Sequence, residues 1–205
     1  MIRAVVLDIG SVLEIIDDSV FPAPFEQRHG LVPGSVHSGA ATLPGDAGRG
    51  ELTEAQIRAH WQQHLHLTDA QAEELMADYW RWYVGTLDQG LFDWFAARRP
   101  RFRTGIVSNS GPGAREAERC WGFEEITDDI VYSHEVGLLK PDPRIFSLAA
   151  ERLGVRPEEV VYLDDVEGHV AAARSVGFRA VVHRSTPESI AEVEAVIEAE
   201  LTRGT

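Results

Sequence analysis

Short apolar runs that end in polar residues recur along the chain. Three of them occupy residues 4–8, 104–110 and 160–165, and two similar runs occupy residues 129–133 and 180–183. Their apolar residues are continuous and rich in β-branched side chains, and they do not alternate with polar ones. This pattern is typical of strands that are covered on both faces, as in a parallel sheet.

Helical patterns lie between these runs. In residues 142–155 apolar side chains recur at helical spacing, and Gly154 provides a stop. Residues 167–178 repeat this helical pattern and end near Gly177. Residues 112–123 also predict a helix. The tail after Thr186 predicts an acidic amphipathic helix. The alternation of strands and helices from about residue 101 onward indicates an open α/β sheet.

Residues 17–87 differ from the rest because they predict helices and no convincing strand. Two helical patterns, residues 53–65 and 68–84, each begin with threonine and carry an acid soon after, which is typical of helix N-caps. Residues 30–50 are rich in glycine, serine and proline and predict a partly mobile loop. These features predict a helical insertion between the first strand and the rest of the sheet.

The aromatic segment 79–84, YWRWYV, lies at the end of this insertion. Its apolar residues recur at helical spacing, which favours a place in the core of the insertion or at its interface with the sheet. Lining of a substrate entrance is the alternative.

Composition and charge narrow the class of protein. The 205 residues carry 19 basic and 33 acidic side chains, a net charge of −14, which argues against nucleic-acid and membrane-surface binding because both partners are anionic. Cys120 is the only cysteine, so no intrachain disulfide can form and a reducing compartment is expected. The chain shows neither a signal-peptide pattern nor a membrane-spanning run, so we expect a cytoplasmic protein, either a monomer or a homodimer.

Polar side chains follow three of the predicted strands. Because the carboxyl ends of parallel strands meet at one edge of the sheet, we expect these groups to form a site there. The first strand offers one acid, the second a serine and an amide, and the third two adjacent acids: Asp8, Ser108, Asn109, Asp164 and Asp165. Lys140 precedes Pro141 in a turn-forming stretch.

These groups make chemical sense together. A carboxylate can attack phosphorus, but it repels a phosphate. A hard cation held by carboxylates, with a nearby lysine, would offset that repulsion. Ser108 and the backbone amides after it, which lead into a helix, can bind phosphate oxygens.

Four motifs in order carry a resemblance to a known family. They are LDIGSVL, IVSNS, GLLKPDPRIF and VYLDDVEGHVAAARSVGF, and GRGELTEAQ is similar to a common cap segment. The chain resembles the haloacid dehalogenase-like hydrolase superfamily, in the branch whose helical cap lies between the first and second motifs. The resemblance implies a Rossmann-like α/β core, a parallel sheet with helices on both faces, formed by residues 1–15 and 89–205. It implies a helical cap over residues 16–88.

The resemblance also implies roles for single residues. Asp8 is the expected nucleophile and a metal ligand, and the backbone carbonyl of Gly10 is expected to help bind Mg²⁺. Asp165 is the expected carboxylate ligand, with Asp164 beside it as a further ligand or a supporting group.

Three residues are expected at the phosphate. By the resemblance Ser108 and Asn109 hold the transferring phosphoryl group, and Lys140 bridges the phosphate and Asp8. The chain is therefore predicted to be a Mg²⁺-dependent phosphomonoester hydrolase that acts on a small phosphorylated metabolite through an aspartyl-phosphate.

Two positions depart from the family pattern. Gly10 stands where many phosphatases of the superfamily carry a second aspartate, and His169 stands where the fourth motif commonly has asparagine. Two alternatives stay open: a metal-independent 2-haloacid dehalogenase, and a member that has lost catalysis and binds or regulates a partner. The adjacent acids 164 and 165 argue against the first, and the joint presence of Asp8, Ser108, Lys140 and Asp165 argues against the second.

Overall fold

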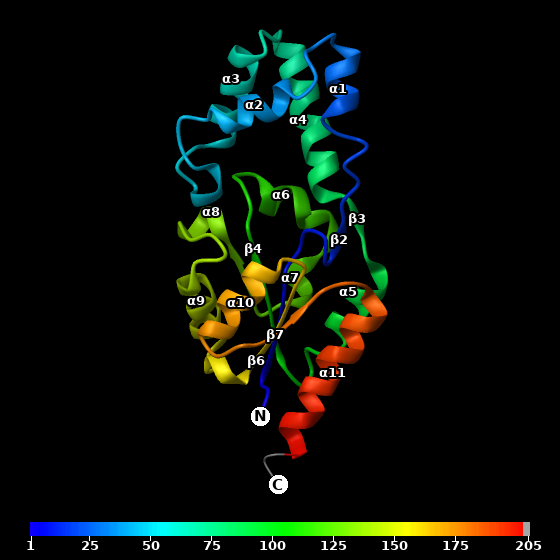
Figure 1. Ribbon diagram of the computed structural model, residues 1–205, viewed down its shortest axis with the longest axis vertical. Coiled ribbons are helices and arrows are strands. Elements are labelled where there is room, and N and C mark those ends of the chain that lie inside the picture. Colours follow the sequence, from blue (N-terminus) through cyan, green and yellow to red (C-terminus); the bar gives the residue numbers. More distant parts are fainter. Residues whose placement is uncertain (203–205) are drawn as a thin grey trace.

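A computed structural model describes residues 1–202 of the chain (Figure 1). Its centre is a five-stranded parallel sheet with the strand order β5-β4-β1-β6-β7. The strands are β1 (Ala4–Leu7), β4 (Arg103–Ser108), β5 (Asp129–Tyr132), β6 (Val160–Asp164) and β7 (Arg179–Val182). All five strands predicted from the apolar runs are confirmed.

Both faces of the sheet are covered by helices, which explains why its strands are continuously apolar. On one face Val5 and Leu7 of β1 pack with residues of α5 (Gln89–Ala96) and α11 (Thr186–Thr202). On the other face Ala4 and Val6 pack with residues of α9 (Pro143–Leu153) and α10 (Glu167–Ser175). Successive side chains of a strand point to opposite faces, so neither face of β1 can be polar.

Short helical turns connect the strands. These are α6 (Ala114–Glu118), η2 (Arg119–Trp121), α7 (Phe123–Ile126), α8 (Ser133–Val136) and η3 (Pro157–Glu159). The predicted helices over 112–123, 142–155 and 167–178 correspond to α6 with η2, to α9 and to α10. Gly154 adopts the left-handed conformation that ends α9, as its place in the sequence predicts.

Helices between β1 and α5 form a separate layer, the α1–α4 unit, at one end of the molecule (Figure 1). Its elements are α1 (Ala23–Arg28), α2 (Ser35–Ala41), η1 (Ala47–Arg49), α3 (Glu54–His64) and α4 (Asp69–Val84). Two segments connect this unit to the sheet. They pair as a short antiparallel ribbon, β2 (Glu14–Ile15) with β3 (Thr86–Leu87). The unit lies within the predicted insertion 16–88, and its boundaries and role as a cap stay a prediction.

Local sequence signals set the starts of the two longest helices of this unit. Thr53 accepts a hydrogen bond from the backbone of Gln56, whose side chain returns to the backbone of Thr53. Thr68 and Gln71 repeat this capping box at the start of α4. The threonine caps predicted from the sequence are confirmed.

The predicted loop over residues 30–50 is wrong for residues 35–41 and 47–49, which form the helix α2 and the turn η1. The cause is a packing contact from elsewhere in the chain. The indole nitrogen of Trp61 donates a hydrogen bond to the carbonyl of Val36, at 3.2 Å, and the ring lies against Gly39. A side chain at position 39 would meet the ring at 2.8 Å, so the glycine that favours a loop here permits close helix packing.

The described helices contain no segment both long and apolar enough to cross a membrane.

Candidate active site

The carboxyl edge of the sheet gathers the predicted site residues around one cavity of about 280 Å³. Asp8 follows β1 directly, Ser108 ends β4, and Lys140 comes from the loop before α9. Six of the predicted residues line the cavity: Asp8, Gly10, Ser108, Asn109, Lys140 and Asp165. The seventh, Asp164, ends β6 and is fully buried.

The ammonium group of Lys140 joins two carboxylates at the base of this cavity. Its Nζ lies 2.7 Å from Oδ1 of Asp8 and 2.8 Å from Oδ2 of Asp164. The side chain of Lys140 is only 1% exposed, and it is the only lysine of the chain. Two carboxylates and one ammonium leave a buried net charge of −1, which a bound cation can offset.

The surroundings shift the pKa values of the two carboxylates in opposite directions. Burial raises the pKa of Asp8 to about 6, with Asp164 adding to the rise and Lys140 opposing it. Burial alone would also raise the pKa of Asp164. Hydrogen bonding from His169 and the charge of Lys140 outweigh it and hold that pKa well below its usual range. Asp164 is therefore ionised across the ordinary pH range, while Asp8 becomes fully ionised only toward neutral pH.

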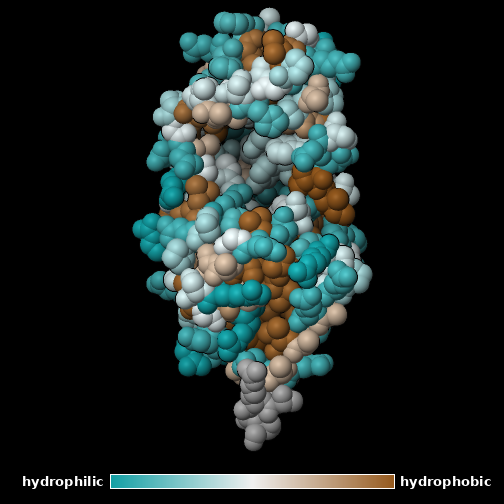
Figure 2. Space-filling model, in the orientation of Figure 1, coloured by the Kyte–Doolittle hydropathy of each residue, from teal (hydrophilic) through white to brown (hydrophobic). Residues whose placement is uncertain are grey.

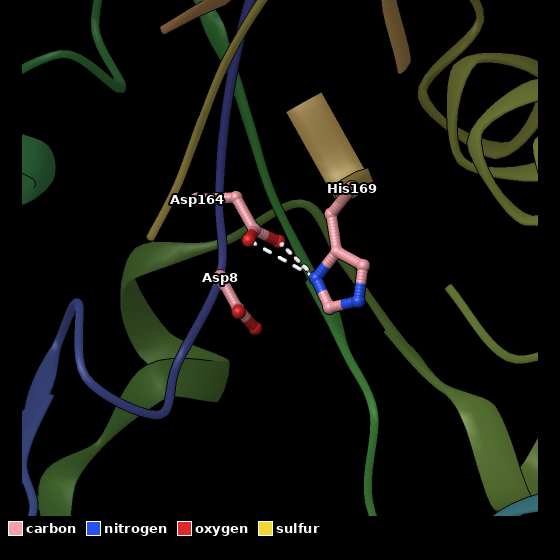
Figure 3. Close-up of side chains that lie close together, drawn as sticks. All are labelled: Asp8, Asp164 and His169. Atoms are coloured by element: carbon pink, nitrogen blue, oxygen red, sulfur yellow. Dashed lines mark hydrogen bonds and ion pairs between the residues drawn. The ribbon is translucent and has the colours of Figure 1, made fainter. Parts of the chain in front are cut away.

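Hydrogen bonds occupy both oxygens of Asp164. Oδ2 accepts from Lys140 and from the hydroxyl of Tyr162, and Oδ1 accepts from the backbone of Val166. Oδ1 also accepts from Nδ1 of His169 (Figure 3). A carboxylate offers about four acceptor positions, so this set uses them all. His169, which departs from the family pattern, thus contacts a supporting carboxylate 3.0 Å away.

Ligand atoms suited to a metal ion converge here. Atoms of Asp8, Asp164 and His169 lie within 4.8 Å of one another (Figure 3). Asp165 lines the same cavity, and within residues 1–202 its carboxylate has no hydrogen bond or ion pair. Hard cations such as Mg²⁺ prefer oxygen ligands, so the oxygens of Asp8, Asp165 and the Gly10 backbone fit such an ion. The predicted ligand Asp165 is the more available of the two adjacent acids.

Asn109 has a contact that the sequence does not predict. Its amide oxygen accepts from the backbone nitrogen of Lys140, at 2.7 Å, and its amide nitrogen donates to the Lys140 carbonyl, at 2.9 Å. These two bonds fix the loop that presents the lysine. The contact of Asn109 with phosphate stays a prediction, as does that of Ser108, which is 2% exposed on the cavity wall.

Sequence reasoning missed Glu14 as a cavity residue. It lines the cavity, is 1% exposed, and its Oε1 has no hydrogen-bond partner among the described residues. Burial, with the nearby Glu118, raises the pKa of Glu14 to about 10, so the group carries a proton at neutral pH. The carboxyl of Glu14 is buried near Glu118, a residue distant in the chain, so the local sequence does not reveal this environment.

The aromatic segment 79–84 reaches the same cavity. Trp82 and Tyr83, in the last turn of α4, line it together with Ile16. The expectation of an interface with the sheet is confirmed for Tyr83, which packs against the core of one sheet face.

Parts of this chain are similar to proteins of known activity. A phosphatase from Mycobacterium tuberculosis (strain CDC 1551 / Oshkosh) is 35% identical over 92 residues, which is 43% of this chain and 42% of that protein. An (S)-2-haloacid dehalogenase from Pseudomonas sp. (strain CBS-3) is 33% identical over 99 residues, 48% of this chain and 40% of that protein. The chain spans less than half the length of the curated relatives it matches.

The fold has close counterparts among solved structures. A HAD family enzyme from Bacteroides thetaiotaomicron, in complex with magnesium and inorganic phosphate, superposes with a TM-score of 0.75 at 19% identity. The superposition covers 90% of this chain and 95% of the other. The model of the haloacid dehalogenase-like hydrolase family matches residues 2–177. With the parallel sheet and the acids at its carboxyl edge, this match shows that the chain belongs to the haloacid dehalogenase-like hydrolase family.

Proposed function

We propose that this chain hydrolyses monoesters of phosphate in the presence of Mg²⁺. The observation that carries the proposal is the position of Lys140, whose Nζ contacts Asp8 and Asp164 at the base of a cavity that Ser108 also lines. A buried ammonium beside the attacking carboxylate provides positive charge where a phosphate dianion must approach.

The proposed reaction has two steps. An oxygen of Asp8 attacks phosphorus, the ester bond from phosphorus to the leaving oxygen breaks, and that oxygen takes up a proton from water to become an alcohol. Water then attacks the aspartyl-phosphate, the bond between Asp8 and phosphorus breaks, and inorganic phosphate leaves. When bound, Mg²⁺ would neutralise charge on the transferring group, held by Asp8, Asp165 and the Gly10 carbonyl.

Lys140 supports these steps without reacting, and two further side chains hold it in place. Asp164 holds Lys140, and Asn109 fixes the backbone around Lys140, so the ammonium stays beside Asp8. In the same proposal the α1–α4 unit acts as a cap that keeps bulk water from the cavity.

A turnover assay tests the proposal. The purified chain should hydrolyse p-nitrophenyl phosphate with Mg²⁺ and lose that activity in EDTA. Asp8→Asn should lower kcat more than tenfold, because an amide is a poor nucleophile, while Asp93→Asn on an exposed face of α5 should not. An Asp8→Asn variant within tenfold of wild type, about 1.4 kcal/mol in the barrier, contradicts the assigned nucleophile.

The same assay separates the rival reaction. A 2-haloacid dehalogenase would release halide from 2-chloropropionate, and EDTA would not affect it. Halide release without phosphate release would therefore replace the proposed function with the dehalogenase alternative. Turnover of neither substrate class would favour the binding or regulatory alternative.

A further inference from the structure

A second cavity, of about 370 Å³, lies in the α1–α4 unit. Its walls are mainly apolar and aromatic. Phe21, Trp61, Tyr79 and Trp82 contribute rings, and α2 contributes Val36 and Ala40. Ligand pockets with such apolar walls and a few polar groups are typical of sites for small organic molecules, and 370 Å³ is within their usual range.

Trp82 belongs to the walls of both cavities. Its indole nitrogen donates a hydrogen bond to Oδ1 of Asp18, at 2.9 Å, which holds the ring in place. Its ring also packs against Phe21 and Tyr79, with centroids 5.8 and 5.9 Å apart. The two cavities therefore adjoin at Trp82.

The outer shape of the molecule is consistent with this connection. Figure 2 shows a hollow between the α1–α4 unit and the sheet. Figure 1 places α2, which carries Val36 and Ala40, on the side of the unit that faces the sheet. A molecule bound at Asp8 thus has an apolar surface ahead of it beyond Trp82.

The charges along the two cavities disfavour a second anionic group on the substrate. Among the described residues that line the two cavities, Lys140 is the one lysine or arginine, and the two charged groups that it contacts, Asp8 and Asp164, are carboxylates. Asp18 lines the second cavity and has no ion-pair partner within residues 1–202. His37 is the one basic side chain among the described residues that line the second cavity. A second phosphate or a carboxylate on the substrate would therefore meet the charge of Asp18 there, with no lysine or arginine to receive it.

We infer that the second cavity binds the leaving group of the substrate, and that this group is an apolar aliphatic or aromatic alcohol. The substrate class is a single phosphate esterified to such an alcohol, without a further anionic group. This inference rests on the proposed function, since it assigns the other end of the same substrate. The rings of Phe21, Tyr79 and Trp82 select the apolar group by removing it from water.

A chain-length series tests the substrate class. Methyl, butyl and 4-phenylbutyl phosphate have alkyl alcohols as leaving groups, so differences in kcat/KM report binding of the chain. Burial of one methylene is worth about a fourfold gain in affinity, so kcat/KM should rise at least about tenfold from methyl to 4-phenylbutyl phosphate. A 4-carboxybutyl ester should lose that gain because its carboxylate enters the acidic path.

A cavity-filling variant ties the effect to this site. Ala40→Trp places a large side chain into the second cavity and should reduce the kcat/KM ratio of 4-phenylbutyl to methyl phosphate about tenfold or more. Ala77→Trp is the matched control, since Ala77 is exposed on α4 and lines neither cavity. It should leave that ratio unchanged.

Binding of the alcohol alone separates a test of the second cavity from a test of the proposed function. Calorimetric titration with 4-phenylbutan-1-ol should show binding to wild type and to Ala77→Trp, and much weaker binding to Ala40→Trp. A flat chain-length series in an active enzyme, or equal alcohol binding by all three proteins, overturns the inference. Failure to hydrolyse any ester refutes the proposed function instead, and the alcohol titration then still decides whether the cavity takes an apolar group.

Discussion

Replacing Glu14 by glutamine should change the pH dependence of stability. The folded chain holds the Glu14 carboxyl protonated, with a pKa of about 10 against an ordinary value of 4.5. The folded state therefore binds one more proton than the unfolded state between these values. Below pH 4.5 Glu14 is protonated in both states, and its contribution to the free energy of unfolding is fully present. That contribution is lost as the pH rises toward 10.

The size of this effect follows from the shift. Each pH unit in the window is worth about 1.4 kcal/mol, so from pH 5 to pH 8 Glu14 lowers the free energy of unfolding by up to about 4 kcal/mol. Glutamine has nearly the same shape as the protonated acid but cannot ionise. Glu14→Gln should therefore match wild type near pH 5 and exceed its stability by several kcal/mol at pH 8.

Urea unfolding at several pH values measures this difference. Tryptophan fluorescence and circular dichroism follow the transition, and the quantity of interest is the variant minus wild-type free energy at each pH. Glu73→Gln, on an exposed side chain of α4, is the control and should show no pH trend. Parallel wild-type and Glu14→Gln curves from pH 5 to pH 8 would refute the buried, protonated state of Glu14.

Two further changes test the charged groups of the site. Asp165→Ala should raise the Mg²⁺ concentration needed for half-maximal activity far more than Glu167→Ala, an exposed acid nearby, and equal Mg²⁺ titrations would contradict the ligand assignment. Lys140→Met should abolish turnover and lower the free energy of unfolding at pH 7 by about 3–5 kcal/mol, because two buried carboxylates lose their shared partner. Arg144→Met, at an exposed ion pair, should cost at most about 1 kcal/mol in the same urea experiment, and a similar loss for both variants would count against the buried triad.

The strands of the sheet and several helix ends could be predicted from the sequence. A run such as residues 160–164 is apolar throughout because both faces of β6 are covered, and this requirement is visible in the run itself. The caps at Thr53 and Thr68 depend on residues three positions away. Such short-range causes leave a pattern in the chain, so the order of strands and helices followed from it.

The loop predicted over residues 30–50 shows where that reasoning fails. Its glycines and serines favour a loop locally, but residues 35–41 form α2, which packs with Gly39 close to the ring of Trp61. The contact joins residues from different helices, so neither segment reveals it alone. The second cavity has the same origin, since its walls come from α2, α3, α4 and the segment before α1.

Residues 164 and 165 show most clearly which features of the site depend on the sequence and which on the tertiary structure. The sequence by itself determined that both acids stand at the end of the β6 run, at the carboxyl edge with Asp8. Only the tertiary structure decided their different environments, because neighbouring side chains at a strand end point to opposite sides. Asp164 turns to Lys140 and Tyr162 and is fully buried, while Asp165 turns to the cavity. The burial of Glu14 was likewise decided by the tertiary structure, which brings Glu118, far away in the chain, close to its carboxyl.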